Sequence, residues 1–99
     1  MKNIKFTIIT FYQFKKIKKI NNIQKLLKEF CLFHKIKGTI ILAEEGINGT
    51  VAGLNEPIDL LQKKLMELDF IKLEQKISFY DFMPFNRMKI KIKKEIVTF

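Results

Sequence analysis

"GTIILAEEGINGTVAG", residues 38–53, is the stretch that decides the fold of this 99-residue chain. All four glycines of the chain fall within it, which indicates either a tight turn or a backbone that approaches a neighbour closely. Its first part, residues 38–43, is rich in β-branched and aliphatic residues and predicts a strand.

Two turns compete for the rest of this stretch. Asn48-Gly49 is a two-residue hairpin signal. A bend at residues 44–46 instead leaves residues 47–53 as a strand long enough to pair with the one before it. We predict the second arrangement, in which Gly49 lies inside a strand for a reason of packing or close approach.

Helical periodicity flanks this hairpin on both sides. Before it, residues at spacings of three and four share one face: Ile20, Ile23, Leu26, Leu27, Phe30, Cys31 and His34. After it, apolar residues repeat in the same way from Ile58 to Leu68, and Asn55 is predicted to cap this second helix.

Strand patterns lie outside the helices. Residues 4–14 have apolar residues at both parities, which is typical of a central strand covered on more than one side. Residues 71–82 predict a fourth strand. In the final segment Lys89, Lys91 and Lys93 alternate with isoleucines, and Lys94 breaks this parity, so a bulge or a strand end is expected there.

The order of elements is therefore β-α-β-β-α-β with an extra C-terminal strand. This is the split βαβ or ferredoxin-like arrangement of the α+β class, an antiparallel sheet with two helices on one face. We expect a single domain over residues 1–99. Its terminal segment, residues 83–99, either extends the sheet or leads toward something absent.

The net charge of +9 comes almost entirely from lysine, with Arg87 as the single arginine. It indicates either a polyanionic partner such as nucleic acid or the coding bias of an A/T-rich genome. No apolar run is long enough for a membrane span. The lone Cys31 cannot form an intrachain disulfide, and we expect a cytoplasmic protein.

The lysine row at 89, 91 and 93 has a spacing that can follow a phosphate backbone. Equally, lysines on an edge strand protect it from aggregation. A second basic cluster contains Lys15, Lys16, Lys18 and Lys19. Four aromatic residues could stack on bases, but in so small a domain most are expected in the core: Phe79, Tyr80, Phe82 and Phe85.

A catalytic constellation is hard to assemble from these residues. His34 is expected to be a packed or half-exposed helix residue, and Cys31 a buried hydrophobic one. Glu44 and Glu45 are expected in a solvated turn, with one of the two carboxylates directed inward or capping. Cysteine and histidine spacing suits no metal, and no nucleotide-binding fingerprint is present. We expect no catalytic residue, no metal and no cofactor in this domain.

Three stretches carry a family resemblance: "FYQF" (11–14), "LAEEGINGTVAG" (42–53) and "PFNRMKIKIKKEIVTF" (84–99). They resemble the amino-terminal part of the rhodanese-related tRNA uridine hydroxylase family (TrhO group). The resemblance implies an acylphosphatase-like domain that precedes a rhodanese domain with the catalytic cysteine. It implies an enzyme that converts the wobble uridine of tRNA to 5-hydroxyuridine with molecular oxygen as co-substrate.

If so, this chain is an accessory domain that is not catalytic alone and contacts tRNA and the rhodanese domain. The candidate RNA-binding residues are Lys89, Lys91, Lys93, Lys94, Arg87, Lys15 and Lys16. The candidates for an interface with the rhodanese domain or tRNA are Glu45, Gly46, Asn48 and Gly49. The alternatives are a purely structural domain and an acylphosphatase. The last is disfavoured because residues 15–22 lack the glycine and arginine of a phosphate cradle.

Overall fold

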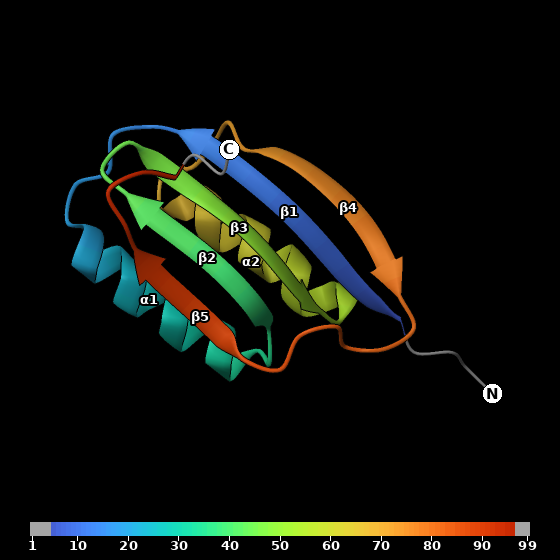
Figure 1. Ribbon diagram of the computed structural model, residues 1–99. Coiled ribbons are helices and arrows are strands. Elements are labelled where there is room, and N and C mark those ends of the chain that lie inside the picture. The colour runs from blue at the N-terminus through green and yellow to red at the C-terminus, as the bar shows by residue number, and fades with distance from the viewer. Residues whose placement is uncertain (1–4, 97–99) are drawn as a thin grey trace.

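The structure is a computed structural model that describes residues 5–96. Its elements follow the predicted order (Figure 1): β1 (Phe6–Phe14), α1 (Ile20–Phe33), β2 (Lys37–Ala43), β3 (Gly46–Gly53), α2 (Asn55–Glu67), β4 (Glu74–Tyr80) and β5 (Met88–Ile92). The turn between β2 and β3 lies at residues 44–45, so the longer third strand is confirmed and the Asn48-Gly49 hairpin does not form.

The strands form one five-stranded sheet in the order β4-β1-β3-β2-β5. The pairs β1–β3, β1–β4 and β2–β3 are antiparallel, as predicted for a ferredoxin-like fold. The terminal strand extends this sheet, and it pairs with β2 in parallel. The prediction of an antiparallel sheet therefore holds for the first four strands, and the complete sheet is mixed.

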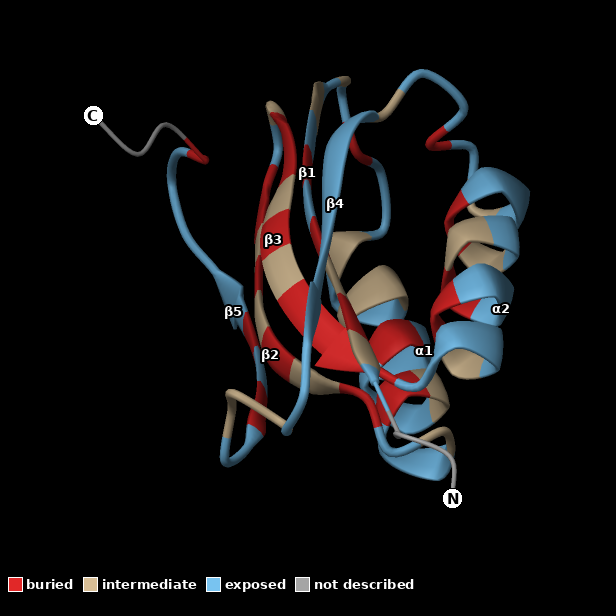
Figure 2. Ribbon diagram, turned by 90° about the vertical axis from the view of Figure 1, so that its right-hand side faces the viewer, coloured by how far each residue is buried: buried red, intermediate tan, exposed pale blue. Residues whose placement is uncertain are grey.

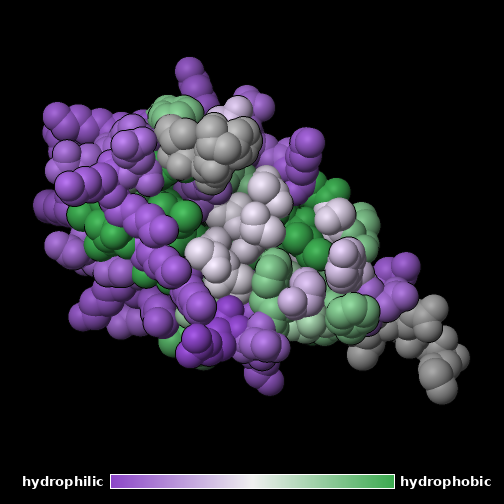
Figure 3. All heavy atoms as spheres, in the orientation of Figure 1, coloured by the Kyte–Doolittle hydropathy of each residue, from purple (hydrophilic) through white to green (hydrophobic). Residues whose placement is uncertain are grey.

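Both helices cover the same face of the sheet, and the core lies between them and the strands (Figure 2). Ile9 and Phe11 of β1 point into this core, where they meet Leu27 of α1 and Leu61 of α2 within one buried cluster. We call the opposite face the open face; it is turned toward the viewer in Figures 1 and 3.

The first strand is central in the sheet but is covered on one face only. Thr7, Ile9 and Phe11 are buried, whereas Thr10, Tyr12 and Phe14 are exposed on the open face. The expectation of a strand covered on more than one side was wrong for this reason.

The expectation that the late aromatic residues belong to the core was also wrong. Phe79, Tyr80 and Phe82 have exposed fractions of 60%, 48% and 65%, and Phe85 is half-buried. The cause is the position of α2, which packs against β1 and β3 and leaves the edge strand β4 uncovered. All of β4 is exposed.

Two local expectations at element ends had different outcomes. Asn55 does not cap α2, because Leu54 occupies the cap position and Asn55 Oδ1 instead accepts a hydrogen bond of 3.4 Å from Thr7 Oγ1. The broken parity at Lys94 marks a strand end, since β5 stops at Ile92 and Lys94 lies in a bend.

Candidate functional site

The lysine row of β5 projects from the open face. Met88 and Ile90 are buried toward α1, where Gln24 Nε2 of that helix donates a 2.8 Å hydrogen bond to the Ile90 carbonyl. Because side chains alternate along a strand, Lys89 and Lys91 are directed to the other side, and both are exposed. This parity is what places two ammonium groups along one edge of the open face.

Lys93 continues the row beyond the strand. Its N–H donates to the Leu42 carbonyl at 2.8 Å, which extends the pairing with β2 by one step. Lys93 and Lys94 line a wide hollow of about 620 Å³ together with Ile20 and Glu44. At the other end of β5, the structure brings a further predicted residue to the same edge.

That residue is Arg87, which is exposed and precedes β5 directly. Its carbonyl accepts a 2.9 Å hydrogen bond from the Gly38 N–H, which fixes the backbone where β5 begins. Arg87 lines a hollow of about 270 Å³ with Thr39, Phe85 and Lys89, among others. The first basic cluster, from Arg87 to Lys94, therefore follows one edge of the sheet.

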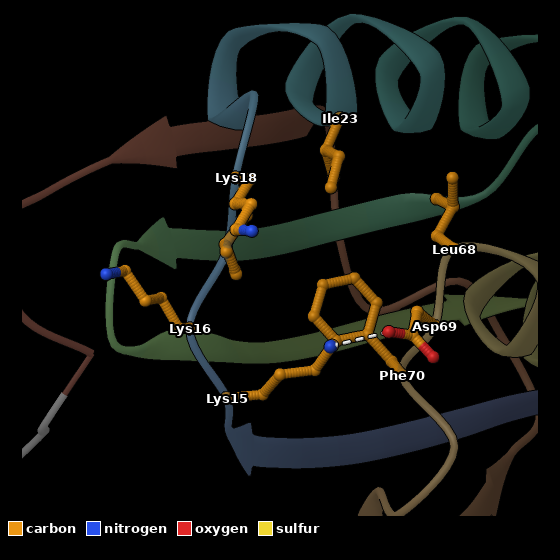
Figure 4. Close-up of a pocket in the computed structure, with 8 residues that line it drawn as sticks. Lys15, Lys16, Lys18, Ile23, Leu68, Asp69 and Phe70 are labelled. Atoms are coloured by element: carbon orange, nitrogen blue, oxygen red, sulfur yellow. Dashed lines mark hydrogen bonds and ion pairs between the residues drawn. The ribbon is translucent and has the colours of Figure 1, made fainter.

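The second basic cluster, Lys15 to Lys19, lies in the connection between β1 and α1. Lys15 Nζ is 2.6 Å from Asp69 Oδ2, an ion pair across a hollow of about 320 Å³ whose lining includes Phe70 (Figure 4). Lys16 is exposed and points away from this pair (Figure 4). The charge of Lys15 is thus partly balanced by Asp69, whereas the Lys16 side chain is exposed and directed away from that pair.

Two amides of the connection between β1 and α1 are bonded to the β2–β3 turn. The N–H groups of Lys15 and Ile17 donate to the carbonyls of Glu45 and Glu44, at 2.8 and 2.9 Å. Amides that are already bonded to carbonyl groups cannot bind the oxygens of a phosphate. These two amides are therefore not free for a phosphate, and their contacts place the β2–β3 turn between the two basic clusters.

The predicted interface residues Glu45 and Asn48 hold the chain's own terminal segment. Glu45 Oε2 accepts a 2.8 Å hydrogen bond from the Ile96 N–H, and Asn48 Nδ2 donates to the Ile96 carbonyl at 3.0 Å. Ile96 is buried. The pair therefore binds both polar groups of one residue's backbone, as a neighbouring strand would.

Gly46 and Gly49 serve the packing of the same region. A Cβ on Gly46 would lie 2.2 Å from the Gln13 carbonyl oxygen, and a Cβ on Gly49 would lie 2.7 Å from Cζ of Phe11. Gly46 lets β1 and the end of β3 approach each other. Gly49 makes room for the Phe11 ring in the core, which is the packing reason expected for a glycine inside this strand.

Sequence reasoning missed the residues in the middle of the open face. Cross-strand pairing places five polar residues in one row: Lys76, Thr10, Thr50, Thr39 and Lys89. Thr50 Oγ1 donates to Thr10 Oγ1 at 3.3 Å. In the next row, Tyr12 and Lys91 flank Asn48 and Ile41. The even-numbered polar residues of β1 and β3 were the available signal for this face.

The lone thiol and the lone histidine have structural surroundings. Cys31 is fully buried, and this burial raises the pKa of its thiol to about 12, so it is protonated and unreactive at neutral pH. The His34 ring lies 4.3 Å from the Phe30 ring, with Phe33 edge-on at 5.0 Å. Both residues match the packed roles that we expected.

Neither a metal site nor a membrane-spanning helix is found within residues 5–96. Within that range, no group of three or more histidine, cysteine, aspartate or glutamate side chains is arranged to hold a metal ion. Over the same range, no helix has the length and apolar character needed to cross a membrane.

Comparison with known proteins gives curated relatives and structural neighbours. The chain is 42% identical over 98 residues to the tRNA uridine(34) hydroxylase of Ehrlichia ruminantium (strain Welgevonden). The aligned region covers 93% of this chain and 34% of the relative. It therefore spans about a third of the length of the curated relatives that it matches.

Solved structures share the fold at low sequence identity. BlrP1 BLUF superimposes with a TM-score of 0.68 at 11% identity, covering 95% of this chain and 67% of that one. An acylphosphatase from Coxiella burnetii gives a TM-score of 0.56 at 10% identity, covering 91% of this chain and 94% of that one. These likenesses support the ferredoxin-like architecture.

The family is identified by the sequence over nearly all of the described residues. The sequence model of the family described as UPF0176 acylphosphatase like domain matches residues 6–96, from the start of β1 to Ile96. The chain belongs to the family of the UPF0176 acylphosphatase like domain.

Proposed function

We propose that this chain is the accessory domain of a tRNA uridine(34) hydroxylase and that it contributes tRNA binding through the lysine edge of the open face. The relatives' name supports the tRNA substrate. The observation that carries the binding role is the parity of β5, which directs the exposed Lys89 and Lys91 away from the core and to the side of the sheet opposite the helices.

Electrostatics favour a phosphate backbone as the ligand of this edge. Lys89 and Lys91 are two residues apart on one strand, a separation of roughly 6–7 Å. Arg87 precedes them, and Lys93 and Lys94 follow, so the positive charges form a line along β5. A line of cations of this kind binds a phosphate backbone with little dependence on base sequence, and its affinity falls strongly as the salt concentration rises.

We place the oxidation outside the described residues of this chain. The sole thiol, Cys31, is fully buried and protonated, so it is unsuited to nucleophilic chemistry. The resemblance assigns the reaction to a protein that also carries a rhodanese domain and uses molecular oxygen as co-substrate. In this proposal the chain delivers tRNA to that domain, and the protein works in the cytoplasm, where tRNA is modified.

A purely structural role is the second candidate, and one observation favours it. Ile77 and Phe79 of β4 are directed to the helix side of the sheet, yet 53% and 60% of their surfaces are exposed. An uncovered apolar strand edge is a typical place for another protein part to pack. In this alternative the lysines serve only solubility.

Charge reversal separates the two candidates. The test variant is Lys89→Glu with Lys91→Glu, and the matched control is Lys28→Glu with Lys63→Glu, an equal change of charge at exposed positions on the two helices. Affinity of the chain for unmodified tRNA is measured at low salt by fluorescence anisotropy, with circular dichroism to verify folding. We expect the test variant to lose about tenfold or more in affinity and the control to lose little.

Equal affinity in both variants would favour the structural role. A wild-type chain that fails to bind tRNA at low salt would reject the binding role altogether.

A further inference from the structure

The open face combines a basic edge, a floor of small polar residues and an exposed aromatic ring. We infer that this face binds an unpaired segment of RNA, with phosphates at Lys89 and Lys91, the sugar backbone over the threonine row, and one base stacked on Tyr12. This inference rests on the proposed function and specifies it, because it names single-stranded RNA as the part of the ligand that this face recognises.

The ends of this face are covered, and its middle is polar. Ala43 and Ala52 have the parity of the open face but are fully buried, whereas the middle carries Thr10, Thr39 and Thr50. Figure 3 shows this middle as pale, weakly polar residues, with hydrophilic residues gathered on the β5 side. Hydroxyl groups both donate and accept hydrogen bonds, so such a floor suits sugar and phosphate oxygens. A protein partner seated here would instead bury polar hydroxyls.

Tyr12 is placed to stack on a base near the end of β1, beside Asn48, which binds the carbonyl of the terminal-segment residue Ile96. Tyr12 is 47% exposed and lies in the same cross-strand row as Lys91, three strands away, which corresponds to about 14 Å. Phe14 meets the Tyr12 ring at 6.3 Å and an angle of 74°, so it does not lie parallel on that ring. Short single-stranded segments can reach from the lysine edge to such a ring.

Charge and stacking together select unpaired RNA over a duplex. Lys37, Lys76, Lys89 and Lys91 stand on the open face. The carboxylates of Glu74 and Glu45 lie on or beside it, and that of Glu45 is bonded to the Ile96 N–H. Any nucleic acid would meet this charge. Only a base outside a helix presents its π-face to an aromatic side chain on a flat sheet.

The test compares one sequence in two forms. The probes are a short oligouridylate with a single 2-aminopurine and the same strand annealed to its complement. Binding to the complete chain is followed at low salt by anisotropy and by 2-aminopurine fluorescence, which falls when the base stacks. We expect tighter binding of the single strand and quenching only in that complex.

Variants of Tyr12 assign the stacking. Tyr12→Phe should bind as the wild type does, whereas Tyr12→Ala should lose about 5- to 150-fold in affinity for the single strand. Tyr12→Leu keeps apolar bulk on the strand and should show the same loss without a folding defect. Phe33→Ala is the matched control, because Phe33 is an exposed aromatic residue on α1.

The outcomes separate this inference from the function on which it rests. If the duplex binds as tightly as the single strand, or if Tyr12→Leu keeps wild-type affinity and quenching, the face is not a single-strand platform, while lysine-dependent tRNA binding stands. If the chain binds neither probe nor tRNA, both are overturned.

Discussion

The backbone N–H of Ile96 donates a 2.8 Å hydrogen bond to Oε2 of Glu45. The Ile96 carbonyl is held from the other side by Asn48 Nδ2 at 3.0 Å. Two side chains of the glycine-rich stretch thereby fix the terminal segment beside the open face.

Removing the carboxylate should release the terminal segment. In Glu45→Ala the buried Ile96 amide loses its acceptor, so we expect its hydrogen exchange to quicken markedly and the free energy of unfolding to fall by about 1 kcal/mol. Exchange of the individual amide is measured by NMR. Glu44→Ala is the control, because the neighbouring Glu44 side chain is exposed. Unchanged Ile96 exchange in Glu45→Ala would show that the clamp does not form in solution.

Adding a methyl group to Gly49 should overpack the core. The new Cβ would lie 2.7 Å from Phe11 Cζ and 3.0 Å from Ile40 Cγ1, so Gly49→Ala is expected to cost about 1–3 kcal/mol of stability. Each kcal/mol corresponds to a loss of about 4–8 °C in Tm for a domain of this size. Thermal denaturation checks the shift, and Phe11→Leu should recover part of it in the double variant. A Gly49→Ala chain with the wild-type Tm would refute this packing account.

Burial of Cys31 should make stability fall at high pH. The pKa of the folded thiol is raised from its ordinary 9.0 to about 12 by desolvation. Above about pH 9 the unfolded chain releases a proton that the folded chain retains, so the free energy of unfolding falls by up to about 1.4 kcal/mol per pH unit. The contribution is fully present below pH 9 and is lost as pH rises toward the folded pKa.

Lysines titrate in the same range, so the comparison needs a variant without the thiol. Denaturant unfolding of the wild type and Cys31→Ala from about pH 8 upward should give a steeper decline for the wild type. Parallel declines would mean that the thiol is not desolvated in the folded state.

Most of the fold could be predicted because its signals are local. Helical spacing, strand alternation and the glycine cluster each depend on neighbouring residues, and they gave the order of elements and the turn at residues 44–45. The position of β4 was less accessible. Whether Phe79 is buried depends on how far α2 reaches across the sheet, which no local pattern encodes.

The site divides in the same way. The exposure of Lys89 and Lys91 follows from the alternation of side chains along a strand, so it could be predicted from the sequence. The grip of Glu45 and Asn48 on Ile96 joins residues far apart in the chain. It also uses the backbone of its target, so the only trace in the side chains is a buried apolar residue at position 96.

The salt dependence of tRNA binding tests the central claim most directly. Affinity is measured over a series of KCl concentrations for the wild type, for Lys89→Gln with Lys91→Gln, and for the control Lys28→Gln with Lys63→Gln. We expect the logarithm of the affinity to fall linearly with the logarithm of the salt concentration. The slope of the β5 variant should be shallower by about 0.7–0.9 for each lysine removed, while the control keeps the wild-type slope. Identical slopes for the two double variants would contradict the assignment of tRNA phosphates to the open face.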